Sequence, residues 1–265
     1  MAYPSTDELG EAGLRLGIAA PLLTVTLDRP EVRNAQTPAM WRCLAAIGAA
    51  VPSDVRVVAV RGSGPSFSAG LDRAMMAADG VPGEASFADM AAMPSAECKQ
   101  LIASYQAAFA WLGHEQFVSI AVVQGHAVGA GFQLALACDL RILADDARLC
   151  MREPALGLVP DLGGTKPLVE LVGYSRALEI CATSRWVDGD EALSIGLATA
   201  VVTPDAMDET LAAYVTSLTA ANYGAVKDTK ALLRDASERD SEEQRRAERT
   251  AQVRRLRALM SVRHP

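Results

Sequence analysis

Cysteine and histidine are scarce in this chain of 265 residues, and neither is spaced as a metal site would require. The sequence contains five cysteines at scattered positions and three histidines, and it has no Cys-x-x-Cys pair. An odd and scattered set of cysteines argues against a disulfide framework, and the missing Cys-x-x-Cys spacing argues against zinc. We therefore expect no metal centre, and we expect a reducing, cytoplasmic location.

Long apolar runs, an export signal and an excess of positive charge are also missing. No stretch approaches the roughly 20 apolar residues of a membrane-spanning helix. The opening letters, MAYPSTDELGE, contain neither a basic segment nor an apolar one, so we expect no export signal. The formal net charge is −7, which disfavours nucleic acid as a partner. We expect neither a membrane nor a nucleic acid to be the partner of this protein.

Several common catalytic motifs are absent as well. Gly129-Ala130-Gly131 follows a predicted strand, but a dinucleotide-binding fingerprint would need a further glycine where this chain has Leu134. Neither GxxxxGK[ST] nor the nucleophile elbow GxSxG occurs. The three histidines have no evident serine and aspartate partners, which disfavours a Ser–His–Asp triad.

The apolar pattern that is present indicates an α/β fold. Several segments carry apolar residues at consecutive positions, as strands of a buried parallel sheet do. Segments with helical spacing alternate with them, which is typical of an α/β core. The expected strands are 22–27, 55–60, 119–124 and 139–144, and the first expected helix is 38–51.

The character of the sequence changes along its length. From about residue 167 the segments read as successive helices, so we expect a core over 1–200 and a helical region over 201–265. The segment 74–98 has weak periodicity with interspersed glycine and proline, which predicts loose packing. The basic run Arg245 to Arg257 reads as a solvated helix face.

Motifs spread over the whole chain, in a fixed order, resemble the crotonase superfamily, also called the enoyl-CoA hydratase/isomerase family. They are LDRPEVRNA, FSAGLD (67–72), GAGFQLALACDLRI, EPALGLVPDLGGT (153–165) and LVELVGYSRALEICATSRWVDGDEALSIGLATAVV. The resemblance implies a spiral of ββα units with a C-terminal helical trimerisation region, and thus a homotrimer or hexamer. It also implies an acyl-CoA thioester substrate. Coenzyme A would enter as part of that substrate, and no separate cofactor is implied.

The resemblance also implies an oxyanion hole, in which two backbone N–H groups stabilise a thioester enolate. On the family pattern these belong to Leu71, after the glycine of SAG, and to Ala130, in the middle of the small triplet. The local sequence fits, because each donor follows a strand and lies near a glycine. Ala130 would also begin a helix, where free N–H groups favour negative charge. The alternative is that both segments are plain strand-to-helix connections.

Gln133 and Glu153 stand where the hydratases of this family have two water-activating glutamates. An amide neither gives nor takes a proton near neutral pH, although it can donate and accept hydrogen bonds. Gln133 therefore cannot be a general base, but it could orient a water, the thioester or Glu153. The alternative is a core amide with satisfied hydrogen bonds.

One remaining carboxylate suits the migration of a double bond, in which a proton leaves one carbon and returns to another. Some isomerases of the family use a glutamate at the position of Glu153. Pro154 restricts the backbone of Glu153 and could shift its carboxylate. The alternative is a surface or salt-bridged glutamate beside Arg152. Asp161 is a second candidate for the base, with a helix N-terminal cap as its alternative role.

Several residues are candidates for coenzyme A contacts on the resemblance. The arginines match the geometry of phosphate, and backbone groups would meet the adenine and the pantetheine. For the basic residues a solvated surface role is the alternative. The candidates are Arg29, Arg33, Ser68, Ala69 and Leu71, followed by Lys227 and Lys230.

Other polar residues near these motifs are assigned structural roles. Asp72 is expected to anchor its loop, Asp139 to be a structural carboxylate at a helix–strand junction, and His126 to pack. The resemblance thus implies an acyl-CoA enzyme, an enoyl-CoA isomerase or a broader hydratase/isomerase homologue, with Glu153 as the base and Asp161 assisting or substituting. A weak hydratase and a non-catalytic acyl-CoA-binding protein are the alternatives.

Overall fold

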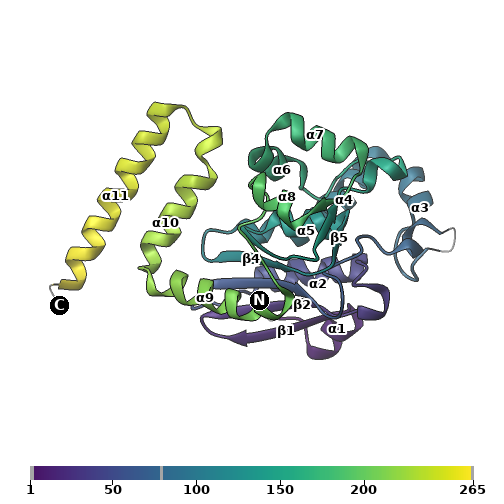
Figure 1. Ribbon diagram of the computed structural model, residues 1–265, viewed down its shortest axis with the longest axis horizontal. Coiled ribbons are helices and arrows are strands. Elements are labelled where there is room, and N and C mark those ends of the chain that lie inside the picture. Colours follow the sequence, from purple (N-terminus) through teal and green to yellow (C-terminus); the bar gives the residue numbers. More distant parts are fainter. Residues whose placement is uncertain (1–2, 78–79, 264–265) are drawn as a thin grey trace.

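Two β-sheets organise the chain in the computed structural model, which describes residues 3–77 and 80–263 (Figure 1). The larger sheet has the strand order β1-β2-β3-β4-β6-β9, and it is parallel except for the antiparallel pair β1–β2. Its strands are β1 (Leu14–Ala19), β2 (Leu22–Leu27), β3 (Val57–Gly62), β4 (Val118–Val123), β6 (Leu140–Ala144) and β9 (Ala200–Val202). The smaller sheet has the order β5-β7-β8, with β5 (His126–Val128), β7 (Arg148–Cys150) and β8 (Val187–Asp188).

Helices cover both faces of the larger sheet. The α-helices are α1 (Thr6–Glu11), α2 (Pro38–Ala49), α3 (Phe87–Ala92), α4 (Ser95–Ala110), α5 (Ala130–Ala137), α6 (Thr165–Val172), α7 (Tyr174–Thr183), α8 (Gly189–Ser194), α9 (Met207–Ala220), α10 (Tyr223–Arg234) and α11 (Ser241–Arg263). Short 3₁₀ helices include η1 (Pro30–Val32), η2 (Arg73–Met76), η3 (Trp111–Gly113) and η4 (Glu153–Leu156). None of these helices combines the length and the apolar character needed to cross a bilayer.

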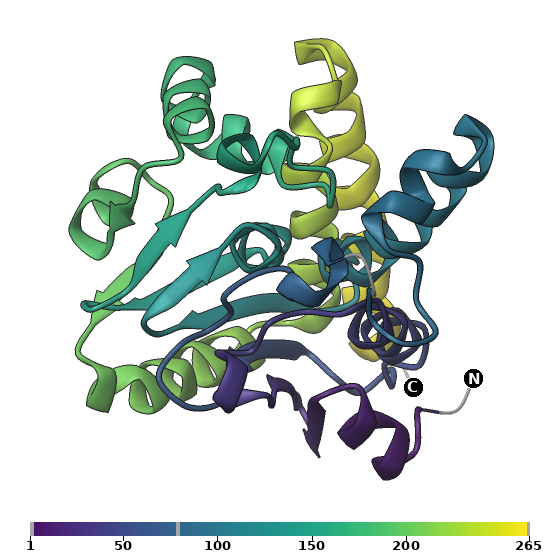
Figure 2. The same cartoon turned by 90° about the vertical axis from the view of Figure 1, so that its right-hand side faces the viewer.

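Alternate residues of the central strands supply two cores, because successive side chains of a strand point to opposite faces. Val58 and Val60 of β3 belong to the larger core, which includes residues of α2, α4 and α5. Val57 and Ala59 belong to the second core, where Met207 of α9 packs. Figure 2 shows α9 along one face of the larger sheet, in the lower part of the view. Because β3 is buried on both faces, it needs apolar residues at consecutive positions. This is the pattern from which the strand was predicted in the sequence.

The small sheet shows a repeating unit. β4 is followed by β5, and β6 by β7, and β5 pairs in parallel with β7. β3 is followed by Ser68, which forms a parallel bridge with Ala127 of β5. After each of these strands of the large sheet, the chain therefore continues into the next neighbouring segment of the small sheet. This repeated step from one sheet to the other is the spiral of ββα units that the resemblance implied.

The C-terminal helices differ in what they cover. The expected boundary at residue 200 falls on β9, which pairs with β6, and α9 still packs on the sheet. The pair α10 and α11 stands beside the main body (Figure 1). Asp228 of α10 binds Arg254 and Arg255 of α11. These two arginines correct the expectation that the whole basic run is a solvated face, because they hold the helix pair together.

Some elements were not expected from the sequence. Strand β1 is largely exposed, and helix α4 begins at Ser95, inside the segment expected to pack loosely. Of the described residues of 74–98 only Met75 and Ser86 are buried, which agrees with loose packing over most of this segment. Residues 78–79 of the same segment lie outside the described residues.

Candidate active site

Parallel pairing at the small sheet brings three segments of the chain together. The N–H of Ser68 donates to the carbonyl of His126 at 2.9 Å, and the N–H of Val128 donates back to the carbonyl of Ser68 at 3.0 Å. The N–H of Gly129 donates to the carbonyl of Cys150 at 2.8 Å. Because parallel strands end at the same edge of a sheet, the residues that follow each of these strands meet there.

The N–H groups of Leu71 and Ala130 lie at this edge without partners among the described residues. Gln36 bonds to the residues on both sides of Leu71, since its N–H donates to Gly70 and its carbonyl accepts from Asp72. The N–H of Leu71 therefore points away from Gln36. Ala130 is the first residue of α5, where N–H groups have no acceptor within the helix.

Two glycines allow these segments to approach so closely. Gly70 has φ +88°, and a Cβ there would lie 2.4 Å from the carbonyl oxygen of Val128 and 3.6 Å from the nitrogen of Ala130. A Cβ at Gly131 would lie 2.7 Å from both the Cβ and the carbonyl oxygen of Ser68. Any larger residue at either position would push the two segments apart.

Leu71 and Ala130 line one cavity with a volume of about 970 Å³. Apolar residues of η2, α3 and α4 line this cavity, and so do Glu153 and Asp161. Three arginines are also among the lining residues. These arginines are Arg33, Arg73 and Arg152. The cavity thus combines an apolar wall, two backbone donors, two carboxylates and positive charge.

Glu153 is the first residue of η4, and Pro154 is accommodated within this short helix. Its Oε1 accepts a hydrogen bond from Nε2 of Gln133 at 2.7 Å. Its Oε2 is buried without a partner among the described residues. Burial raises the pKa of Glu153 above its usual value, and the negative charge of Asp161 contributes in the same direction. Glu153 forms no ion pair with Arg152 among the described side chains, and its Oε2 is buried, so neither the salt-bridged nor the surface alternative holds.

Gln133 is fully buried and uses its amide to join two parts of the site. Nε2 donates to Glu153, while Oε1 accepts from the N–H of Leu162 at 2.9 Å and from the N–H of Gly164 at 3.2 Å. Burying an amide is tolerated when its hydrogen bonds are made. Gln133 is therefore a satisfied core amide and also the residue that orients Glu153, so both interpretations of the sequence hold.

Asp161 lies in the segment that Gln133 binds. Burial raises the pKa of its carboxyl group. The following helix begins at Thr165, and its N-cap is Gly164, with no side-chain cap. The alternative role of Asp161 as a helix cap is therefore wrong. Its carbonyl accepts from the side chain of Gln106 in α4 at 2.6 Å, which ties this segment to the apolar wall.

The candidate coenzyme A residues fall into two groups. Arg33 and Ala69 line the cavity together with Leu71. Arg29 instead binds Asp72 at 2.9 Å and the carbonyl of Ala35 at 2.7 Å. Ser68 is fully buried, and its hydroxyl donates to the carbonyl of Asn34 and accepts from Gln36 and Gly70. In this conformation Arg29 and Ser68 shape the loops rather than face the cavity.

Lys230 does not reach the cavity. Its Nζ donates to the carbonyls of His114 and Phe117 and to Asp139, at 2.8, 2.7 and 2.6 Å. These three bonds use all of its hydrogens, which corrects its assignment as a phosphate contact. Lys227 pairs with Glu115 at 3.2 Å.

The structural roles expected for two aspartates are confirmed. Asp72 caps η2 by accepting from the N–H of Ala74, and it also binds Arg29. Asp139 accepts from both the N–H and the hydroxyl of Ser119.

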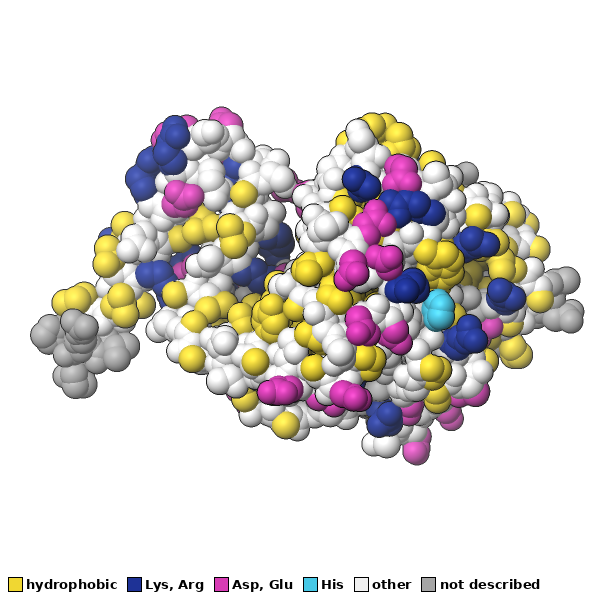
Figure 3. Space-filling view, viewed as in Figure 1, with side chains coloured by type: hydrophobic (Ala, Val, Ile, Leu, Met, Phe, Trp, Pro, Cys, Tyr) yellow, Lys and Arg dark blue, Asp and Glu magenta, His cyan; other side chains and the backbone are white. Residues whose placement is uncertain are grey.

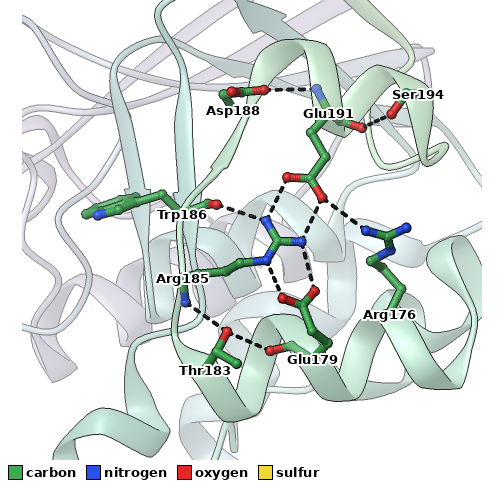
Figure 4. A network of polar contacts seen from close by, with 8 residues as sticks. All are labelled: Arg176, Glu179, Thr183, Arg185, Trp186, Asp188, Glu191 and Ser194. Carbon is green, nitrogen blue, oxygen red and sulfur yellow. Dashed lines mark hydrogen bonds and ion pairs between the residues drawn. The ribbon is translucent and has the colours of Figure 1, made fainter.

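Sequence reasoning missed an aromatic wall of the cavity. His126 packs as expected, edge-on against Trp186 at 5.5 Å between ring centroids, but both rings also line the cavity. Arg185, next to Trp186, donates to both carboxylate oxygens of Glu179 and both of Glu191 (Figure 4). The sequence spacing did not predict this network, because the two glutamates come from different helices, α7 and α8, and only the tertiary fold brings them to Arg185.

The described part of the chain contains no cluster of metal-binding side chains. In residues 3–77 and 80–263 no group of three or more His, Cys, Asp or Glu side chains is placed to hold a metal ion.

Several known proteins with similar sequences or structures carry names from one family. The family model described as Enoyl-CoA hydratase/isomerase matches residues 17–259. The chain is 36% identical over 186 residues to the mitochondrial Delta(3,5)-Delta(2,4)-dienoyl-CoA isomerase of Rattus norvegicus, covering 68% of this chain and 55% of that protein. It is 31% identical over 188 residues to a protein of Rhizobium meliloti (strain 1021) provisionally named enoyl-CoA hydratase, covering 70% of this chain and 66% of that one. The chain thus spans little more than half the length of the rat relative.

A solved structure agrees over almost the whole chain. It is a Thermobifida fusca YX protein, provisionally described as an enoyl-CoA hydratase, in complex with acetoacetyl-CoA. The two chains share 49% identity and a TM-score of 0.93, over 97% of this chain and 100% of that one. On the family match, the relatives and this likeness, the chain belongs to the enoyl-CoA hydratase/isomerase family, the crotonase superfamily of enzymes.

Proposed function

We propose that this enzyme moves a double bond in an unsaturated acyl-CoA thioester, and that Glu153 and Asp161 carry the proton. The observation that carries the proposal is one cavity that holds two carboxylates with raised pKa values together with the free N–H groups of Leu71 and Ala130. An acyl-CoA substrate is supported by the Thermobifida fusca YX structures, which are complexes with acetoacetyl-CoA and with CoA.

The reaction begins when Glu153 removes a proton from the carbon next to the thioester carbonyl. The electron pair left behind spreads into the carbonyl, and the two N–H groups hold the negative oxygen. Each such donor contributes on the order of 3–4 kcal/mol to the transition state. The proton taken by Glu153 then returns at the far end of the conjugated system. Alternatively Asp161 delivers a proton there and the proton on Glu153 passes to Asp161, so that both carboxyl groups regain their starting states. Nothing is added or lost, so the product is an isomer of the substrate.

The two carboxylates suit this proton transfer because burial raises the pKa of each. A general base is most effective when its pKa approaches the working pH. Gln133 cannot exchange protons, and its role is to fix the position of Glu153 relative to the segment of Asp161 by hydrogen bonds to both. The rat relative named as a dienoyl-CoA isomerase supports a reaction that spans more than one double bond.

Arg33, Arg73 and Arg152 are the proposed contacts for the phosphates of coenzyme A. All three line the cavity, and a guanidinium group matches phosphate geometry. Their positive charge supports binding of the anionic end of the substrate, and the apolar lining residues would receive the acyl chain.

The test is incubation with a panel of 2-enoyl- and 3-enoyl-CoA thioesters, followed by mass spectrometry and ultraviolet absorbance. The parent should convert 3-enoyl-CoA to its conjugated isomer. Glu153→Gln should lower the rate roughly 10²–10⁴-fold, the usual contribution of a general base, and should bind acyl-CoA almost unchanged. The exposed Glu209→Gln in α9 is the matched control.

Each other outcome identifies a different base or a different function. If Glu153→Gln keeps its rate and Asp161→Asn loses it, Asp161 is the base. If the parent only adds water to 2-enoyl-CoA, it is a hydratase. If it binds thioesters without turnover, the protein is an acyl-CoA-binding protein and the proposal fails.

A homotrimer, or a hexamer built from two trimers, remains our proposal for the assembly. The pair α10 and α11 stands beside the main body with exposed apolar side chains, which a second copy would cover (Figure 3). These side chains are Leu233, Val253, Leu256, Leu259 and Met260.

A further inference from the structure

The segment that carries Asp161 has no regular secondary structure. It connects η4 to α6, and within residues 158–163 Leu162 is the one buried residue. Gly157 and Gly163 stand at its two ends with φ +76° and +89°, a conformation that glycine adopts readily. The backbone alone therefore does little to fix the place of Asp161, and the side chains that bind this segment must do so.

Two glutamine side chains supply the hydrogen bonds that hold this segment. Oε1 of Gln133 accepts from the N–H of Leu162 at 2.9 Å, and Nε2 of Gln106 donates to the carbonyl of Asp161 at 2.6 Å. Among the described residues, no other hydrogen bond joins residues 159–163 to another part of the chain. Gln106 is thus the side chain that binds Asp161 itself.

Gln106 extends from a helix that is firmly packed. Its neighbours Tyr105 and Phe109 on α4 place their rings against Trp41, with centroids 4.8 and 6.2 Å apart. Gln106 itself is exposed, so the core does not need its side chain. It is also not among the residues that line the cavity in the described part of the chain. Any effect of Gln106 on the reaction must therefore pass through Asp161.

We propose that Gln106 is a positioning residue, which holds Asp161 where it delivers a proton during migration of the double bond. The inference rests on the proposed function, because it concerns the step in which the proton returns. In that step the O–H bond of the Asp161 carboxyl group breaks, and a C–H bond forms at the far end of the enolate. The proton held by Glu153 then restores Asp161.

This step is sensitive to the place of the carboxyl group. Proton transfer requires the donor within hydrogen-bond reach of the carbon that accepts the proton. A misplacement of about 1 Å can cost as much as about 10²-fold in rate. A bond to the backbone of Asp161 itself limits such movement, and it leaves the carboxyl group free to exchange protons.

The first experiment removes the donor of Gln106 and keeps the length of its side chain. Gln106→Met should lower kcat for 3-enoyl-CoA roughly 5–100-fold, with KM changed by less than about twofold, because a positioned proton donor acts in the transition state. Gln100→Met is the matched control, since Gln100 is an exposed glutamine of the same helix without a side-chain hydrogen bond to the described residues. It should keep the parental kcat, and both variants should unfold in urea at the parental midpoint.

The second experiment asks whether Gln106 acts through Asp161. In an Asp161→Asn background, where the proton donor is already lost, adding Gln106→Met should lower kcat by less than about twofold. Residues that act as a unit show such non-additive effects. A general disturbance of the structure would instead lower the rate by the same factor in both backgrounds.

The inference is overturned if the parent isomerises and Gln106→Met keeps its kcat or changes KM alone. An equal loss in the parental and Asp161→Asn backgrounds also overturns it. If Asp161→Asn isomerises at the parental rate, Asp161 delivers no proton, and the inference falls while isomerisation by Glu153 stands. If the parent isomerises no 3-enoyl-CoA, the proposed function itself fails.

Discussion

Changing Gln133 to Glu should convert part of the proposed isomerase activity into water addition. In the parent, Nε2 of Gln133 lies 2.7 Å from Oε1 of Glu153 and donates to it. The substitution replaces this donor with an oxygen and brings two carboxylates into contact. The other oxygen of residue 133 would keep the N–H donors of Leu162 and Gly164.

The magnitude follows from the loss of one interaction and the gain of another. A hydrogen bond to a charged group contributes about 1.5–3 kcal/mol. Two unit charges about 4 Å apart at an effective dielectric constant of about 20 repel by about 4 kcal/mol. The pair should therefore share one proton near neutral pH. Because residue 133 keeps two N–H donors, that proton should reside mainly on Glu153.

Two results should follow for Gln133→Glu. Isomerisation should fall roughly tenfold or more at neutral pH, because its base is now protonated. Hydration of 2-enoyl-CoA should appear or rise, because a carboxylate and a carboxylic acid now face the same water. The assay follows the absorbance of the conjugated thioester together with the mass gained by one water.

The control is Gln133→Met, which removes the same hydrogen bonds without adding a charge. It should lose isomerisation and gain no hydration. If Gln133→Glu isomerises at the parental rate and adds no water, the coupling between residues 133 and 153 is not what determines the reaction.

Three further predictions follow from the structure. Gly131→Ala should lower the free energy of unfolding by about 1–3 kcal/mol in urea denaturation, because its Cβ would meet the backbone of Ser68 at 2.7 Å. A Cβ at Gly113 would have nothing within 4 Å, so Gly113→Ala should change this free energy by no more than about 0.5 kcal/mol. Equal effects of the two variants would contradict the packing argument. Because the pKa of Glu153 is raised in the folded protein, this residue contributes stability at low pH that is lost as pH rises through that pKa. The free energy of unfolding of Glu153→Gln relative to the parent should therefore increase from acidic to neutral pH. A difference between the two proteins that does not depend on pH would contradict this. Sedimentation at micromolar concentration should give a trimer or hexamer, and a monomer would defeat the proposed assembly.

The relation between Gln133 and Glu153 could be predicted from the sequence because both lie beside regular elements. Gln133 is on the buried first turn of α5, and Glu153 begins η4 soon after β7. The small sheet pairs β5 and β7 in parallel, so the residues that follow the two strands lie close together whatever the conformation of the connecting loops. An interval of twenty residues, compared with the family pattern, was enough to pair them.

The role of Lys230 could not be predicted in this way. Its side chain is largely covered, because three acceptors bind its Nζ from segments about a hundred residues away in the sequence. The tertiary fold decides which groups come near this side chain, and no local sequence pattern records that.

The most direct test of the central claim is proton exchange next to the thioester carbonyl. A saturated acyl-CoA is incubated with the enzyme in deuterium oxide, and mass spectrometry and NMR follow deuterium at that carbon. The account predicts exchange by the parent, and a rate reduced roughly 10²–10⁴-fold in Glu153→Gln at unchanged thioester affinity. Exchange at the parental rate in Glu153→Gln, or none in a parent that isomerises 3-enoyl-CoA, would contradict an enolate formed by this carboxylate.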